Sequence, residues 1–181
     1  MTDTQLTTFD EMKKFLQFDD KDAAHLASLQ PIVEKYGSKI TDGFYSRLAL
    51  WPETAKYIEG RVESLSQTHL RWMRELVSGV YDEAYFESRR KIGMVHVKIG
   101  LPPHWVEAVM STIRTEMGFA MAEEIRDPAE FAVKHASFVR ICDLDLLVIN
   151  AAYQDDRLRR LSTFTGMKRQ LLENIIRMPE R

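Results

Sequence analysis

A histidine on an apolar helical face is the first feature of this sequence that could do chemistry. Within residues 89–105, helical spacing places His96 on one face together with Ile92, Val95 and Ile99. An imidazole in such a position is either a core side chain bonded to a neighbour or an axial ligand to haem iron. The spacing alone favours the structural role.

A sharp corner follows this histidine by one turn. Gly100 supplies a helix stop, while Pro102 and Pro103 prevent continuation and suit the first turn of a new helix. His96 is therefore expected near the end of one helix, immediately before the chain turns into the next.

The residues on both sides of this corner resemble the proximal-helix signature of the protoglobins and of the globin-coupled sensors. The matching positions are Ile92-Gly93, His96, Lys98-Ile99-Gly100-Leu101-Pro102 and Trp105. The resemblance extends over about residues 9–153 and implies an all-α, globin-like fold with an extra N-terminal helix. It also implies haem b as the cofactor and His96 as the proximal ligand to its iron.

A Phe-Tyr-x-x-Leu segment is expected on the gas-binding side of the pocket. It comprises Phe44, Tyr45 and Leu48, and the resemblance implies that Tyr45 reaches over the distal face of the haem. Its hydroxyl could then donate to bound O2, which carries partial negative charge, with a gain of roughly 1.5 to 3 kcal/mol. CO is less polarised and should gain less. Ordinary aromatic packing is the alternative role for this tyrosine.

The helix expected at about residues 61–79 has a continuous apolar face. The face consists of Val62, Leu65, His69, Trp72, Met73 and Leu76. The resemblance implies that this is the distal helix, in which Leu65 covers the sixth coordination position of the iron and Thr68 supplies a second hydroxyl. Core packing is compatible with that role for Leu65, and an exposed flank position is the alternative for Thr68.

His69 competes with His96 because its neighbours on both sides of the face are apolar. If both histidines bound iron, the haem would be six-coordinate and closed to gas, as in electron-transfer proteins. We expect His69 to be a core or haem-edge histidine instead, because the family places its ligand before the Gly-Leu-Pro corner. Tyr45 and Leu65 also form a suitable pocket for a small diatomic ligand.

The expected haem contacts come from several segments of the chain. They are His96, Tyr45, Phe44, Leu65, His69, Trp72, Val95, Ile99 and Trp105. Either Arg89 or Arg90 could pair with a haem propionate, although a solvated position is the more common role for a single basic residue.

The overall composition is that of one globular domain with some additional chain. The sequence has 181 residues, 45% of them hydrophobic, and a formal net charge of -2. This balance gives no face-wide basic excess, so no nucleic-acid partner is expected. The polar N-terminus and the lack of a long uncharged run predict no targeting segment and no membrane span. Because Cys142 is the single cysteine, a reducing, cytoplasmic location is expected.

Two long helices, expected at residues 102–126 and 128–154, are assigned to a dimer contact. The second carries an inward stripe made of Phe131, His135, Phe138, Val139, Cys142, Leu146, Ile149 and Tyr153. A further stripe on nearly the opposite side consists of Val133, Ile141, Leu144 and Val148. Nothing in an isolated globin is expected to cover this second stripe, which predicts a homodimer built from both helices of each subunit, as the resemblance also implies. The alternative is a monomer in which the N-terminal lead-in or the C-terminal tail covers it.

The chain becomes strongly charged from Asp155 onward, beyond what a globin core needs. We therefore divide it into a haem-binding sensor domain at residues 1–154 and a C-terminal helical extension or linker at residues 155–181, directed toward a possible output domain. No phosphate loop, nucleophile triad or metal-ligand cluster occurs in the sequence, so no output enzyme activity is expected from this chain.

The resulting interpretation is a haem-based gas sensor that binds O2, and also CO and NO. It would transmit its ligation state through the dimer contact to a signalling output. A standalone O2-binding protein, or an enzyme that turns over NO or peroxide, would use the same pocket and is one alternative. A helical adaptor without a cofactor is another, but it would leave the His96 motif unexplained.

Overall fold

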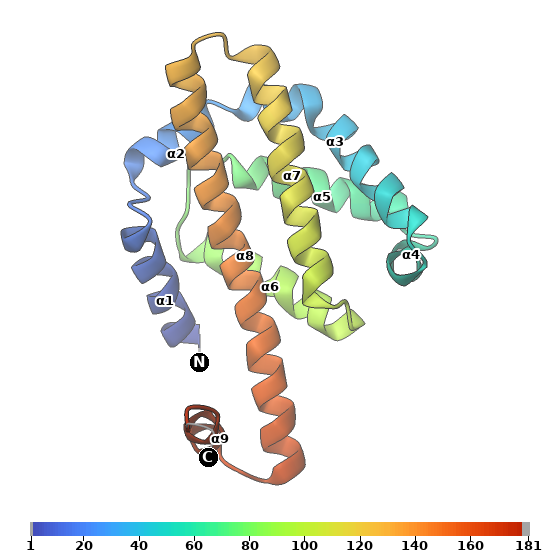
Figure 1. The fold of residues 1–181 in the computed structure, drawn as a ribbon, viewed down its shortest axis with the longest axis vertical. Coiled ribbons are helices and arrows are strands. Elements are labelled where there is room, and N and C mark those ends of the chain that lie inside the picture. The colour runs from blue at the N-terminus through green and yellow to red at the C-terminus, as the bar shows by residue number, and fades with distance from the viewer. Residues whose placement is uncertain (1, 179–181) are drawn as a thin grey trace.

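The computed structural model describes residues 2–178, with side chains from Leu6 onward. This part of the chain contains helices and no strand, which confirms the all-α expectation. The helices are α1 (Thr2–Phe15), α2 (Asp20–Ala27), α3 (Gln30–Leu50), α4 (Pro52–Ile58), α5 (Val62–Leu76), α6 (Glu83–Ile99), α7 (Pro103–Glu124), α8 (Pro128–Thr165) and α9 (Arg169–Ile176). Figure 1 shows α7 and α8 side by side along the long axis, with α5 and α6 crossing behind them.

The starts of α2 and α3 follow from local chemistry. The carboxylate of Asp19 accepts hydrogen bonds from the backbone N–H groups of Lys21 (2.8 Å) and Asp22 (3.3 Å), so it caps α2. Pro31 lies in the first turn of α3, where a missing N–H leaves no helical bond unmade. This proline therefore suits the start of the helix.

The corner expected after His96 is present in the structure. Gly100 adopts a left-handed conformation (φ 71°), and the N–H of Leu101 donates to the carbonyl oxygen of His96 (3.0 Å). Pro102 then precedes the first residue of α7 in an extended conformation. The end of α6 and the start of α7 are thus fixed within a few residues of the histidine.

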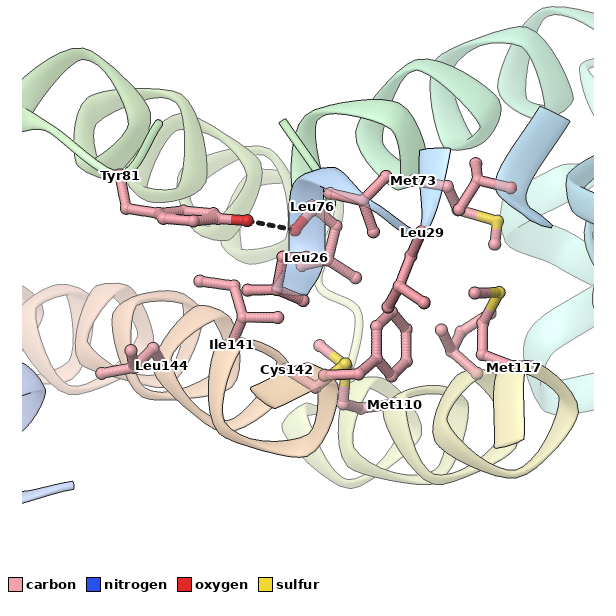
Figure 2. Packing of buried hydrophobic residues seen from close by; sticks show 14 of the residues in the cluster. Leu26, Leu29, Met73, Leu76, Tyr81, Met110, Met117, Ile141, Cys142 and Leu144 are labelled. Carbon is pink, nitrogen blue, oxygen red and sulfur yellow. Dashed lines mark hydrogen bonds between the residues drawn. The ribbon is translucent and has the colours of Figure 1, made fainter. Parts of the chain in front are cut away.

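The main hydrophobic core surrounds α8 and draws side chains from several helices. Figure 2 shows Leu26 of α2 and Met73 of α5 in the same buried cluster as Ile141 and Cys142 of α8. Met110 and Met117 of α7 close the cluster on another side. The loop between α5 and α6 is fixed to the same core, because the hydroxyl of Tyr81 donates to the carbonyl oxygen of Leu76 (2.9 Å).

The second apolar stripe of α8 is buried within this chain, so the prediction that a partner subunit must cover it is wrong. Ile141 and Leu144 are fully buried and Val148 is 1% exposed. They are covered because α1, α2 and α6 all pack against α8, in addition to α7. The alternative in which the N-terminal helix helps to cover the stripe is confirmed. Val133 alone in this set stays exposed, at 47%.

A buried carboxylate fixes α2 on α8. Asp22 accepts hydrogen bonds from the hydroxyl of Ser137 (2.6 Å) and from the guanidinium of Arg140 (2.8 Å). These hydrogen bonds, with burial opposing them, hold the pKa of this carboxyl below its usual value, so it stays charged and paired at neutral pH.

The C-terminal part of the chain continues α8 without a break. The helix passes the expected boundary at residue 154 and ends at Thr165 with Gly166 as its cap, after which α9 turns back toward α8 (Figure 1). Leu172 of α9 is buried, and Arg169 pairs with Asp155 of α8 (2.6 Å). Within the described residues, no helix has the length and apolar character needed to cross a membrane.

Candidate functional site

The structure brings four of the predicted pocket residues together. Phe44 and Tyr45 lie on α3, and Leu65 and His69 lie on the facing side of α5. The ring centroids of Phe44 and His69 are 5.0 Å apart, and the ring of Tyr45 meets that of His69 edge-on at 6.2 Å. Leu65 packs against the buried pair formed by Phe44 and Tyr45. These side chains form one aromatic and aliphatic cluster between α3 and α5.

A threonine that the sequence analysis missed orients His69. The hydroxyl of Thr41, which is fully buried, lies 2.9 Å from Nδ1 of the imidazole. Nε2 is buried and has no hydrogen-bond partner among the described residues. Burial lowers the pKa of His69 to about 4, so the ring is neutral at pH 7. Thr41 lies four residues before Tyr45, and this helical spacing is the feature that could have revealed it.

Trp72 connects this cluster to the core of the protein. Its ring lies 5.3 Å from that of His69, and its Nε1–H donates to the buried carboxylate of Asp145 on α8 (2.9 Å). Asp145 also accepts from the hydroxyl of Tyr85 (2.5 Å). The predicted position of Trp72 beside His69 is therefore observed, with a second contact that spacing on one helix does not show.

The structure gives both arginines of α6 protein partners. Arg89 is fully buried and pairs with Asp145 (2.8 Å) and with Glu75 (2.5 Å). Arg90 pairs with Glu87 on its own helix (2.9 Å). The suggestion that Arg89 binds a propionate is wrong, because its guanidinium is enclosed in an ion-pair network between α5, α6 and α8.

His96 lies on a face of α6 that is only partly covered by protein. Val95 is 54% exposed and Ile99 is 38% exposed, so the helix does not bury this face as the sequence analysis expected. The helix instead buries the face that carries Gly93 and Val97. At Gly93 the missing side chain lets α8 approach closely. The histidine is thus flanked by apolar side chains that remain accessible.

The ring of His96 is suited to metal ligation. Its Nδ1 is buried without a hydrogen-bond partner in the described part of the chain. Burial lowers the pKa of His96 to about 4, so the imidazole is neutral at pH 7 and keeps an unprotonated nitrogen. A neutral imidazole is the form that binds iron.

The two predicted hydroxyl groups differ in their environments. Burial raises the pKa of Tyr45 to about 12, so its phenol stays protonated and able to donate. Thr68 is exposed, and its hydroxyl donates to the carbonyl oxygen of Ser64 one turn earlier on α5 (3.0 Å). The structure therefore groups Tyr45, but not Thr68, with the aromatic cluster.

Trp105 lies apart from the cluster, at the start of α7. Its ring centroid is 6.3 Å from that of Trp51, which is itself exposed, and its other ring neighbour is His104 at 5.4 Å. The predicted role of Trp105 as a haem contact stays a prediction.

Comparison with known proteins identifies the family. A family model described as Protoglobin matches residues 5–159. The chain belongs to the protoglobin family. Among solved structures, this protoglobin is similar to the globin domain of the Geobacter sulfurreducens globin-coupled sensor, with 33% identity and a TM-score of 0.76. That match covers 80% of this chain and 96% of the other.

Two further proteins are similar to this protoglobin. The globin domain of E. coli DosC in its ferrous form has the same fold, with a TM-score of 0.69 at 18% identity, covering 80% of this chain and 98% of that one. The heme-based aerotactic transducer HemAT of Halobacterium salinarum is 28% identical over 114 residues, which cover 61% of this chain. The matched part spans only 23% of the transducer.

Membership of the protoglobin family implies haem b as the cofactor, and the residues present fit it. His96 and His69 are both neutral, and each keeps a buried ring nitrogen without a partner among the described residues. The side chains of Val95 and Ile99 next to His96 are apolar and accessible, as a porphyrin contact requires.

Proposed function

We propose that this chain is a haem-based gas-sensing globin domain in which His96 is the proximal ligand to iron. The observation that carries the proposal is a neutral imidazole flanked by accessible apolar side chains, one turn before the Gly100 corner. It is supported by the relatives, one of which is a globin-coupled sensor and another a heme-based aerotactic transducer.

In this proposal, each residue around the haem has a distinct task. Haem iron, when bound, supplies the binding position for O2, CO or NO. His96 holds the group, and Phe44 and Leu65 keep water from the gas-binding side. Tyr45 would donate a hydrogen bond from its phenol O–H to the gas ligand, since burial raises its pKa and keeps the phenol protonated. Thr68 has a secondary role, because its hydroxyl proton is already donated to a backbone carbonyl.

His69 is proposed as a haem-edge histidine that shapes the pocket. Thr41 fixes one of its ring nitrogens, and the rings of Phe44 and Trp72 lie at 5.0 and 5.3 Å from it. The porphyrin contacts of Trp72, Val95, Ile99 and Trp105 belong to the same proposal. Of these, Val95 and Ile99 lie on the same face of α6 as His96.

Signal transmission is proposed to involve a homodimer formed by α7 and α8. Because the second stripe of α8 is buried in the chain itself, the contact would use other apolar side chains on these helices. Phe119 of α7 is 64% exposed and Val133 of α8 is 47% exposed, which supports this choice of surface. Residues 1–154 are then the sensor and residues 155–181 the link to an output domain. This module has no output activity of its own in the proposal, and it acts in the cytoplasm.

The visible spectrum of the purified chain tests the central proposal. The ferrous protein should show a Soret band that shifts when O2 or CO is added, and His96→Ala should lose haem binding. His104→Ala is the matched control, because this histidine is exposed at the start of α7. A colourless wild-type protein, or a Soret band that survives His96→Ala unchanged, would contradict the proposal. Steady turnover of NO or peroxide with a reductase would favour the alternative function, that of a haem enzyme that acts on NO or peroxide.

A further inference from the structure

α8 contacts the His96 turn of α6 at both of its ends. Before the histidine, a Cβ atom added at Gly93 would lie 2.8 Å from the Cβ of Ala152 and 2.9 Å from the carbonyl oxygen of Ile149. After the histidine, the hydroxyl of Tyr153 donates to the carbonyl oxygen of Leu101 (2.8 Å). We call residues 149–153 the α8 clamp. Both contacts act on the backbone of α6 and of the corner after it, one through close packing at Gly93 and the other through the Tyr153 hydroxyl.

A second hydroxyl reaches the same corner from another helix. Tyr57 of α4 donates to the carbonyl oxygen of Gly100 (2.9 Å), next to the carbonyl that Tyr153 holds. The two tyrosines make equivalent bonds to neighbouring residues, but only Tyr153 belongs to α8. Replacing each tyrosine in turn therefore distinguishes the loss of any hydrogen bond to the corner from the loss of the one that connects the corner to α8.

The clamp lies within one helical turn of a residue that holds α9. Asp155 follows Tyr153 by two residues and pairs with Arg169 of α9 (2.6 Å). α9 also buries Leu172 as it packs back toward α8. Because α8 runs without a break to Thr165, no hinge separates the clamp from this contact (Figure 1). The continuous helix therefore provides a path by which a displacement of the clamp can reach the docking position of α9.

We propose that Tyr153 is a positioning residue for His96 and that the α8 clamp couples the His96 turn to the docking of α9 on α8. The inference rests on the proposed function, since it requires His96 to ligate haem iron. A gas ligand that shifts the His96 turn changes the contact at Leu101 and Gly93, and the clamp carries that change to Asp155. The docked and undocked states of α9 are the two states that the haem ligand biases.

Hydrogen exchange of the haem-loaded chain tests the coupling. Amide exchange in residues 169–176 is compared between the ferrous protein without ligand and the same protein with CO. The wild type should show a difference between the two states. Tyr153→Phe should reduce that difference by about two- to tenfold, the range expected for one lost hydrogen bond. Tyr57→Phe, the matched control, should keep it.

Resonance Raman spectroscopy provides a readout that a purely structural role would not change. The iron–histidine stretching frequency of the ferrous, unliganded protein should shift in Tyr153→Phe, because the His96 turn loses one of its two fixed ends. If amide exchange in α9 of the wild type is equal with and without CO, the proposed coupling through the α8 clamp is wrong. It is also wrong if Tyr153→Phe shows the same exchange difference as the wild type. A wild type without a Soret band would overturn the proposed function and the clamp together. A normal, His96-dependent spectrum with ligand-independent exchange would overturn the clamp alone.

Discussion

The hydroxyl of Thr41 lies 2.9 Å from Nδ1 of His69, and the two residues come from different helices. The bond orients an imidazole that is otherwise surrounded by aromatic rings. Since Nδ1 is engaged, Nε2 is the ring nitrogen of His69 left without a partner among the described residues. The environment of this histidine is therefore set by α3 as much as by α5.

Replacing Thr41 with valine should destabilise the protein, because it removes the hydroxyl and leaves a buried imidazole nitrogen unpaired. The expected loss is about 1 to 3 kcal/mol in the free energy of unfolding. Urea denaturation measures it. Thr68→Val is the control, since its hydroxyl is exposed, and it should change stability by less than about 0.5 kcal/mol. Equal effects of the two substitutions would show that the Thr41 bond contributes nothing specific.

Replacing Tyr45 with phenylalanine should speed O2 release. A hydrogen bond to the polarised ligand is worth roughly 1.5 to 3 kcal/mol, so the dissociation rate should rise about ten- to hundredfold. CO release should change much less. Stopped-flow displacement of each gas measures both rates, and Tyr57→Phe serves as the control because its hydroxyl bonds the corner after α6 instead. An O2 rate within twofold of the wild type would exclude Tyr45 as the donor.

Adding a methyl group at Gly93 should destabilise the protein. The new Cβ would come within 2.8 Å of Ala152 and 2.9 Å of the Ile149 carbonyl oxygen, so α6 and α8 would have to separate. The expected cost is about 1 to 3 kcal/mol. Gly43→Ala is the control on α3, since no atom lies within 4 Å of its added Cβ, and it should stabilise by about 0.5 to 1 kcal/mol. Thermal and urea unfolding of both variants would reveal whether the helix crossing is as close as the structure shows.

Stability of the haem-free chain should fall as the pH decreases from about 6.5 to about 4. Burial lowers the pKa of both His69 and His96 to about 4, so below the usual histidine value the unfolded chain binds protons that the folded chain excludes. Each histidine should contribute a slope of up to about 1.4 kcal/mol per pH unit in this window. Urea denaturation between pH 7 and 4 measures the slope. His69→Phe should flatten it, because that variant lacks one of the two histidines with a lowered pKa.

Local patterns in the sequence predicted the structural features that depend only on residues close together in the chain. The glycine and prolines after His96 predicted the corner between α6 and α7, since they act on backbone conformation within a few residues. The spacing of Leu65 and His69 on α5 predicted that they share a helical face, whereas the family resemblance was needed to place Tyr45 in the pocket. The family followed from the motif around His96, and the match over residues 5–159 confirms it.

Only the tertiary structure shows which side chains are buried and which distant residues pair, because both depend on which helices pack together. The sequence showed that α8 is apolar on two sides, but only the packing of α1, α2 and α6 shows that both sides are buried in one chain. The pairing of Arg89 with Asp145 spans more than fifty residues, and the Thr41 bond joins two helices. Helical periodicity assigns a side chain to a face, whereas the partner of that face is set by the packing of distant segments.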